Sequence, residues 1–357
     1  MSASADRFAS VDAMRGLTVA AMLLVNNPGD WGHVYAPLLH APWHGCTPTD
    51  LIFPFFLFVV GVSIALGLVP RFERGTNARV LHRAIATRAL RIIALGLLLH
   101  LLAWWAYEQA HYRPWGVLQR IGLCFLVAAP LAMHLRSRMQ WLCIAALLLG
   151  DWALLAWGGS TERYLNIVDR VDTALLGPLL YDYDAGTGLG HDPEGLLSTL
   201  PAIATVLLGV RAGAWLRAGR TQVLLIAAAA CLLAAGAWSW LLPINKALWT
   251  PSYVLWSGGW AMLALAAAHA LVDRRGWPPL GRSFGVNAIA AYAGSGVMVC
   301  LFAGLGWWGA IYQRGFADWM TPRFGPYLPS LAFAMAFVAL WWLIVRGMDR
   351  MGWHPKV

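Results

Sequence analysis

A chain of 357 residues that is 59% hydrophobic and only 12% charged, with 21 tryptophans, is far more apolar than a soluble domain, in which about a quarter of residues are charged. This composition excludes an ordinary soluble enzyme and predicts an all-α, polytopic membrane protein. The net charge of +9 is accounted for by arginines in the loops at one membrane face, where they meet anionic lipid. We therefore expect no nucleic-acid partner.

Apolar runs of about 20 residues, the length that crosses a bilayer as a helix, recur along the whole chain. Because no long linker or internal repeat separates them, we expect one membrane domain over residues 1–357, with an acidic outer loop at about 158–195. The ten predicted spans lie near residues 8–27, 51–69, 86–107, 117–135, 140–157, 196–215, 222–242, 252–272, 285–305 and 328–348.

The loop charges predict the orientation of these spans, since cytoplasmic loops carry an excess of Lys and Arg. With the N-terminus inside, 19 of the 26 basic residues fall on the inner side, so both termini are predicted to be cytoplasmic. The inner set is Arg7, Arg15, Arg71, Arg74, Arg79, Arg83, Arg88, Arg91, Arg136, Arg138, Arg211, Arg217, Arg220, Arg274, Arg275, Arg282, Arg346, Arg350 and Lys356; the outer set is Arg113, Arg120, Arg163, Arg170, Lys246, Arg314 and Arg323.

At the start of the first span, Asp12 and Arg15 are three residues apart and share one helix face. One interpretation is an interfacial ion pair; the other is that Arg15 faces an inner cavity and meets an anionic ligand. The arginines of the first inner loop, including Arg88 and Arg91, have a similar pair of interpretations. They form a solvated basic stripe or a docking site for a phosphorylated ligand.

The first outer loop ends in a stretch from His40 to Asp50 that leads directly into the second span. Asp50 is placed to cap that helix at its N-terminus and also to orient a neighbouring imidazole. A histidine there can act as a base or nucleophile near neutral pH. Zinc is the rival hypothesis for His33, His40 and His44, but their spacings of seven and four in a proline-broken segment form no helical ligand pair. We therefore expect no metal.

Further polar groups lie at the outer side of the predicted helices. Arg120 is a cation just inside the outer boundary of the fourth span, where it must find a partner or a wet cavity. The acidic outer loop ends with Asp192 and Glu194, which suit a cationic or hydroxyl-rich substrate, and Lys246 follows the seventh span.

Several segments together resemble the heparan-alpha-glucosaminide N-acetyltransferase family of transmembrane acyltransferases, including its bacterial NagX-type members associated with amino-sugar use. The matching segments fall in order along nearly the whole chain. They are Ser10–Gly16, Val25–Asn26, His40–Gly45 with Asp50–Pro54, Gly116–Gly122, Asp192–Leu197, Leu208–Gly213 and Pro243–Trp249.

The resemblance implies transfer of an acetyl group from cytosolic acetyl-CoA, across a bacterial inner membrane, to the amine of a glucosamine-type sugar. It implies that His40 is the active histidine, acting as base or acetyl carrier. Asn26 would lie near the thioester and Asp50 would orient the imidazole. On this scheme we assign donor binding to Arg15, Arg88, Arg91 and Asn287, and acceptor binding to Trp43, Arg120, Asp192, Glu194 and Lys246.

Two further points stay open on the sequence. The alternative function is an amino-sugar transporter, in which the intramembrane polar groups line a path, although no inverted repeat is detectable in the sequence. Besides membrane lipid, a second copy of the chain is a partner we allow for, as a homodimer.

Overall fold

The computed structural model describes residues 8–355, so Arg7 and Lys356, which enter the charge pattern above, lie outside the described residues. Within residues 8–355, nine helices are long and apolar enough to cross a membrane, and a tenth candidate is a helix pair bent by 93°. The nine are α1 (Ala9–Asn26), the run of η2 (Pro48–Leu51), α2 (Ile52–Ser63), η3 (Ile64–Leu68) and α3 (Val69–Glu73), α4 (Ala78–Ala106), α5 (Val117–His134), α6 (Ser137–Gly158), α8 (Thr199–Arg217), α9 (Thr221–Ser239), α10 (Pro251–Ala268) with η5 (His269–Arg274), and α15 (Tyr327–Arg350).

The bent pair consists of α12 (Ala288–Gly304) and the helices that follow it. A two-stranded antiparallel hairpin, in which Asp182 lies opposite His191, is the one sheet in the part of the chain that the structure describes. The remaining elements are η1 (Ala36–Leu38), α7 (Ile167–Leu176), η4 (Gly177–Leu179), β1 (Asp182–Asp184), β2 (Leu189–His191), α11 (Arg282–Val286), α13 (Trp307–Tyr312), η6 (Gln313–Ala317) and α14 (Asp318–Phe324).

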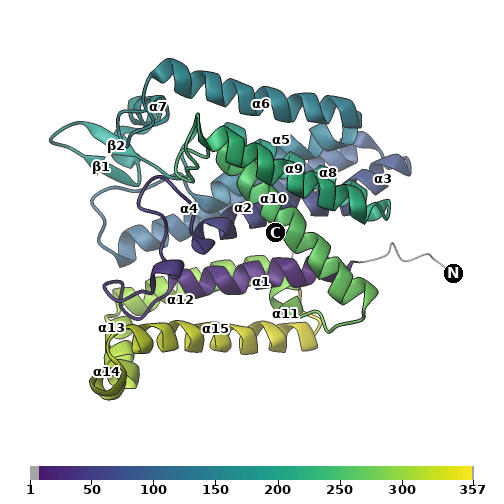
Figure 1. The fold of residues 1–357 in the computed structure, drawn as a ribbon. Helices are drawn as coiled ribbons and strands as arrows, with labels where there is room; N and C mark the ends of the chain where they lie inside the picture. Colours follow the sequence, from purple (N-terminus) through teal and green to yellow (C-terminus); the bar gives the residue numbers. More distant parts are fainter. Residues whose placement is uncertain (1–7, 356–357) are drawn as a thin grey trace.

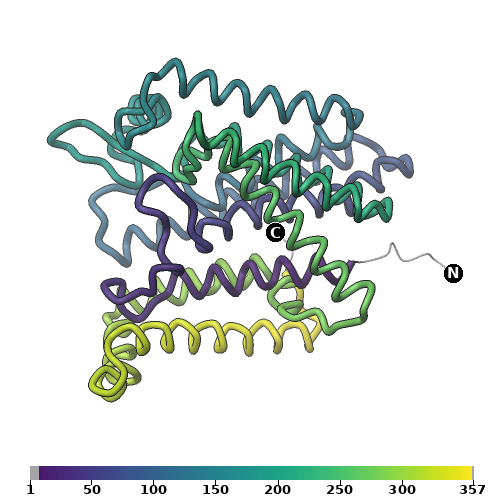
Figure 2. The backbone as a smooth tube through the Cα atoms, viewed as in Figure 1, coloured from purple at the N-terminus to yellow at the C-terminus, as the bar shows by residue number. Residues whose placement is uncertain are grey.

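Most of the long helices run roughly parallel, with α10 inclined across them, α6 along one edge of the bundle and α15 along the opposite edge (Figure 1). At one end lie α7, the hairpin, α13 and α14; at the other end lie α3 and the start of α1 (Figure 1). The tube view shows that α1 begins, and α15 finishes, at the α3 end (Figure 2). We call this the α3 end and the opposite one the hairpin end.

The prediction of a helical, multi-pass membrane protein is confirmed, and each predicted span corresponds to one helix or to the bent pair. The main difference is α4, which begins at Ala78 and not near residue 86. Its first turns carry arginine, a good helix former that lowers hydropathy, and the Asn77 side chain caps them by accepting a hydrogen bond from the Arg79 amide. A search for apolar runs therefore misses two turns of real helix.

The core is built around α8, in which most side chains are buried. It crosses α2 at a point where both helices present glycine. A Cβ on Gly61 would lie 1.9 Å from the Val206 carbonyl oxygen, and one on Gly209 would lie 2.0 Å from that of Phe58. Only glycine permits so close an approach, so this contact fixes the position of α2 and of the loop that precedes it.

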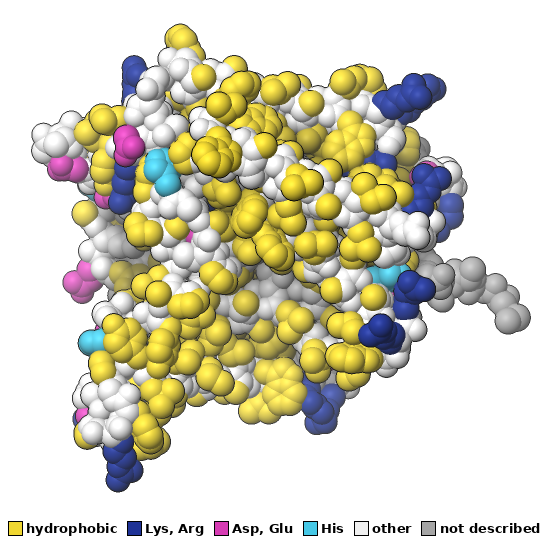
Figure 3. Space-filling view, in the orientation of Figure 1, with side chains coloured by type: hydrophobic (Ala, Val, Ile, Leu, Met, Phe, Trp, Pro, Cys, Tyr) yellow, Lys and Arg dark blue, Asp and Glu magenta, His cyan; other side chains and the backbone are white. Residues whose placement is uncertain are grey.

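Charged side chains are segregated along the bundle axis. On the face shown in Figure 3, most Lys and Arg side chains lie at the α3 end, whereas most acidic side chains lie at the hairpin end. This asymmetry agrees with the loop-charge pattern. The placement of the α3 end in the cytoplasm remains a prediction.

Candidate functional site

His40 and Asp50 meet at the hairpin end of α2. The ring Nδ1 of His40 lies 2.7 Å from Oδ1 of Asp50, whose side chain is only 1% exposed. The local sequence builds this contact, since Pro48 opens η2 and Thr47 forms a capping box with Asp50. The second carboxylate oxygen of Asp50 accepts hydrogen bonds from the amides of Ala41 at 3.0 Å and Thr47 at 2.9 Å. Asp50 therefore both caps the helix and holds the imidazole.

Lys246 reaches the same histidine from the loop between α9 and α10. Its Nζ lies 3.1 Å from Nδ1 and 3.3 Å from Nε2 of His40, and 3.7 Å from Oδ1 of Asp50. The two loops are joined by the Gly45 amide, which donates to the Ile244 carbonyl at 2.7 Å. Gly45 has a φ of 107°, a backbone conformation that favours glycine. We call His40, Asp50 and Lys246 the His40 cluster.

Burial lowers the pKa of Lys246, although the carboxylates of Glu194 and Asp50 oppose the shift. A desolvated ammonium gives up its proton more readily than an exposed one. The His40 cluster thus contains an amine with an increased fraction of its free-base form beside an imidazole.

The His40 cluster borders a small cavity of about 160 Å³, the outer pocket. Both polar and apolar side chains line it. Its lining includes Asn26, the last residue of α1, together with His40, Thr49, Glu194, Lys246 and Tyr292 and the apolar residues Phe53, Phe56, Ile92, Ile121 and Ile289. A mostly apolar pocket with a few convergent polar groups is typical of a small-molecule site.

Glu194 is held at the edge of the outer pocket by Arg113. Nη2 of Arg113 lies 2.7 Å from Oε2 of Glu194, and its Nε donates to Oδ2 of Asp192 at 2.9 Å. Burial would lower the pKa of Arg113, but the two carboxylates raise it overall. For Glu194, burial alone would raise the pKa, but the positive charges of Arg113, Arg120 and Lys246 bring this pKa below its ordinary value. Glu194 is therefore an anion that faces the pocket.

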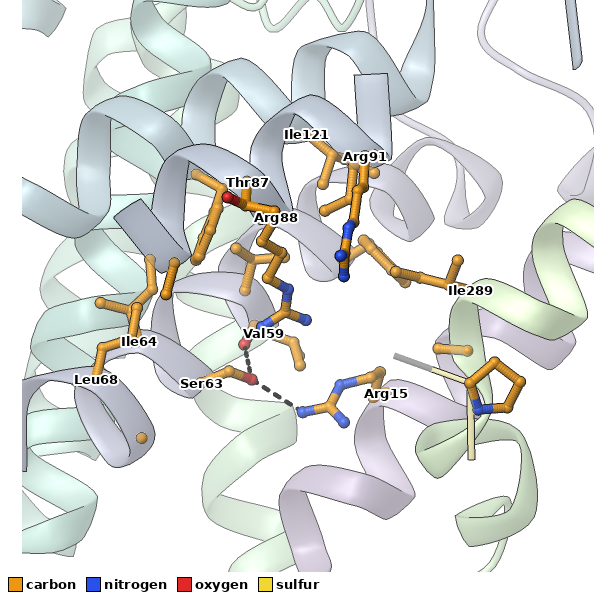
Figure 4. A pocket seen from close by; sticks show the side chains of 18 of the residues that line it. Arg15, Val59, Ser63, Ile64, Leu68, Thr87, Arg88, Arg91, Ile121 and Ile289 are labelled. Atoms are coloured by element: carbon orange, nitrogen blue, oxygen red, sulfur yellow. Dashed lines mark hydrogen bonds between the residues drawn. The ribbon is translucent and has the colours of Figure 1, made fainter. Parts of the chain in front are cut away.

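A much larger cavity of about 880 Å³, the inner cavity, opens on the arginine-rich side of the same helices. Figure 4 shows Arg88 and Arg91 of α4 pointing into it from one side and Arg15 of α1 from the other. Nη2 of Arg15 donates to the Ser63 hydroxyl at 2.9 Å, and Nη1 lies 3.2 Å from Oδ1 of Asp12. Arg15 thus pairs with Asp12 and also lines a cavity, and its contact with an anionic ligand stays a prediction.

The inner cavity and the outer pocket share a wall. Four apolar side chains line both, namely Phe56, Ile92, Ile121 and Ile289. In addition, the π-helical turn η3 interrupts the span that contains α2 beside the inner cavity, and π-bulges are frequent at functional sites. A basic cavity and an imidazole site therefore lie on opposite sides of one apolar layer.

Four residues assigned to binding are placed elsewhere. Arg120 is fully buried, with Nη2 donating to the Gly195 carbonyl at 3.0 Å, and Asp192 is occupied by Arg113. Trp43 donates from Nε1 to the Thr161 carbonyl at 2.9 Å in the outer loop. Asn287 faces α15, where its Nδ2 donates to the Val345 carbonyl at 3.4 Å. None of these four is among the residues that line the two cavities.

Sequence reasoning missed Arg113, Thr49 and Tyr292. Arg113 carried a usable signal, because it is an outer arginine in a chain whose basic residues gather on the inner side, and it faces an acidic loop. Thr49 and Tyr292 enter the outer pocket through the packing of η2 and α12, and neither carries a local pattern that would indicate this.

The fold and the two cavities define a polytopic helical membrane protein with a polar site at the hairpin end of its bundle. Comparison with known proteins identifies the family: the profile described as "Heparan-alpha-glucosaminide N-acetyltransferase, catalytic" matches residues 7–244. The chain belongs to this family, as the ordered motifs predict.

Two curated relatives are proteins named heparan-alpha-glucosaminide N-acetyltransferase. The one from Homo sapiens is 31% identical over 360 residues, covering 82% of this chain and 53% of the relative. The one from Mus musculus is 30% identical over 362 residues, covering 83% of this chain and 54% of the relative. The chain thus spans about half the length of the curated relatives that it matches.

Proposed function

We propose that this protein is a transmembrane acyltransferase that moves an acetyl group from acetyl-CoA to the amine of a glucosamine-type sugar. The observation that carries the proposal is the shared apolar wall, with arginines in the inner cavity and the His40 cluster in the outer pocket. Family membership supports acyl transfer and an amino-sugar acceptor. We further propose a bacterial inner membrane as its location, with the α3 end in the cytoplasm.

The inner cavity is suited to the phosphorylated part of the donor. Arg15, Arg88 and Arg91 converge there (Figure 4), and guanidinium groups bind phosphate through charge-assisted, often bidentate hydrogen bonds. The cavity is also apolar along α2 and α5, which suits an uncharged arm that carries a thioester. With its phosphates among the arginines, the donor would present its acetyl group at the wall formed by Phe56, Ile92, Ile121 and Ile289.

The outer pocket is suited to the chemical step. The Asp50 carboxylate accepts hydrogen bonds only, so Nδ1 of His40 carries the proton toward it and Nε2 is left with its lone pair. An imidazole in this tautomer can take a proton from the acceptor ammonium, or can attack the thioester and carry the acetyl group. Asn26 lines the same pocket, and its amide can donate to the oxyanion that develops on the acetyl oxygen.

Glu194 is proposed to hold the acceptor. It lines the outer pocket as an anion that Arg113 positions, and a carboxylate attracts the ammonium of an amino sugar. Asp192 and Arg120 would support this arrangement from behind, because Asp192 shares Arg113 with Glu194 and Arg120 binds the Gly195 carbonyl.

The test is a transfer assay with purified protein, acetyl-CoA and glucosamine, in which both CoA release and N-acetylglucosamine are measured. The proposal predicts equal amounts of the two products, and it predicts that glucosamine is needed for sustained CoA release. Uptake of labelled glucosamine into vesicles that lack acetyl-CoA, with no acetylated product when the donor is added, would instead support the transporter.

A further inference from the structure

Lysine is rare in this chain, and one lysine stands at the His40 cluster. Of the 26 basic residues, only Lys246 and Lys356 are lysines and the other 24 are arginines. Arginine stays charged at any pH a protein meets, whereas lysine can lose its proton and become a nucleophile. Within residues 8–355, the Lys or Arg side chain that contacts His40 is therefore a lysine, the basic residue type that can become an amine nucleophile.

The Lys246 amine lies where an acceptor amine must lie. A base has to be within hydrogen-bond reach of the nitrogen that it deprotonates, and Nζ of Lys246 is 3.3 Å from Nε2 of His40. The same pocket contains Asn26 and Glu194, the groups proposed to stabilise the oxyanion and to bind an ammonium. Lys246 thus places a primary amine among every group that the transfer to a sugar would use.

We infer that Lys246 is an acceptor for the acyl group, so that the protein acetylates its own lysine when an acyl thioester is bound and no amino sugar is present. This inference rests on the proposed function for its donor. The free-amine form of Nζ attacks the thioester carbonyl, the N–C bond forms and the C–S bond breaks. The proton lost from Nζ passes through Nε2 of His40 to the departing thiolate, which leaves as CoA.

Two surroundings of Lys246 favour this reaction. Burial lowers its pKa, which increases the fraction of free amine, and Asp50 holds the imidazole beside it at 2.7 Å. Acetylation would replace the ammonium by a neutral, larger amide within a pocket of about 160 Å³. The modified protein would therefore have less room for the sugar and would have lost the cation that faces Asp50 and Glu194.

The experiment uses the purified full-length protein in detergent, incubated with acetyl-CoA labelled with ¹³C in the acetyl group, with and without glucosamine. Peptide mass spectrometry then measures labelled acetyl on Lys246 and, for comparison, on Lys356, the other lysine of the chain. The inference predicts label on Lys246 in excess of Lys356, suppressed by glucosamine and reduced by about 10²-fold in His40→Gln. The Lys246→Arg variant is expected to carry no stable label at that position.

The outcomes separate the two proposals. Acetylation of glucosamine without label on Lys246 would overturn the self-acetylation and leave the proposed function standing. Label on Lys246 at the same level as on Lys356, or unchanged in His40→Gln, would also overturn it, because the site would then not drive the reaction. If neither glucosamine nor Lys246 is acetylated, the proposed function fails and the inference fails with it.

An acetyl-histidine intermediate would not be mistaken for this product. An acetyl group on imidazole is hydrolysed readily, whereas the amide on Lys246 survives digestion. Label that is lost on mild alkaline treatment would therefore be assigned to His40 and would count against Lys246.

Discussion

Nδ1 of His40 lies 2.7 Å from the carboxylate of Asp50, and the same carboxylate caps η2, the turn that leads into α2, through the amide of Thr47. One buried acid thus links helix geometry to the orientation of an imidazole. A substitution of Asp50 should therefore reduce both protein stability and the acetylation rate, whereas a substitution of Thr47 or His40 should mainly reduce one of the two.

His40→Gln is expected to lower the rate of glucosamine acetylation by about 10²–10⁴-fold, the usual contribution of a general base. Steady-state assays of CoA release would measure it. His33→Gln is the matched control, because His33 forms a similar pair with Asp30 at 2.6 Å in the same outer loop but does not line the outer pocket. An equal loss in both variants would mean that loop integrity, and not the imidazole of His40, limits the rate.

Asp50→Asn is expected to reduce both kcat and the melting temperature. The amide cannot hold His40 in the tautomer that leaves Nε2 free, and it weakens a capping interaction of about 0.5–2 kcal/mol. Thr47→Ala removes the capping hydroxyl and leaves the carboxylate, so it should lower the melting temperature with a much smaller loss of kcat. A wild-type kcat in Asp50→Asn would remove the carboxylate from the mechanism.

Arg88→Gln is expected to raise KM for acetyl-CoA by about tenfold or more, since a hydrogen bond to a charged group contributes about 1.5–3 kcal/mol. KM for glucosamine should change little, because Arg88 lines the inner cavity and not the outer pocket. Arg217→Gln provides the comparison, as Arg217 lies at the same end, paired with Glu73 at 2.9 Å outside the cavity lining. If both variants raise KM alike, a general loss of positive charge is responsible.

Glu194→Gln is expected to show the opposite pattern, with KM for glucosamine raised about tenfold and KM for acetyl-CoA nearly unchanged. The reason is the loss of the anion that faces the acceptor ammonium. Glu162→Gln, an exposed outer-loop carboxylate whose side chain is 69% exposed, serves as the control. Competition between labelled and unlabelled glucosamine would measure the change in KM for the sugar in each variant. A rise in KM confined to acetyl-CoA would contradict the assignment of Glu194 to acceptor binding.

Asp172 of α7 predicts a pH dependence of stability. Burial raises its pKa to about 6, above the ordinary value of 3.8, so the folded protein retains a proton that the unfolded chain releases. Its stabilising contribution is therefore present below about pH 4 and is lost as the pH rises through about 6. Melting curves from pH 4 to 7 should fall less steeply in Asp172→Asn, and parallel curves would contradict the assignment.

Local pattern carried much of the fold and part of the site. Hydropathy predicts the number and approximate position of the spans, because each span is one continuous apolar run. The pairing of His40 with Asp50 is also predictable from the sequence, because both residues lie close to the start of the same helical segment. Contacts between distant segments are not predictable in this way. Lys246 contacts His40 although the two are 206 positions apart, and no local sequence pattern at either residue indicates this contact.

The rotation of a helix about its axis explains why Asn287 does not line the inner cavity. Asn287 was grouped with the donor-binding residues because it lies at the inner end of its span, yet its side chain faces Val345 of α15. Its neighbours Val286 and Ala288 line the inner cavity instead. A rotation of about 100° per residue decides which side chain faces a cavity, and an apolar span without a polar stripe gives no indication of that angle.

The most direct test of the account is the sidedness of the two substrates. Oriented membrane vesicles would receive acetyl-CoA only at the face that carries the α3 end, and ¹³C-labelled glucosamine only at the face that carries the hairpin end. Sealed control vesicles would check that neither substrate leaks across the membrane. We expect labelled N-acetylglucosamine on the glucosamine side of the membrane and free CoA on the acetyl-CoA side. Product formed only when both substrates share one face would contradict it.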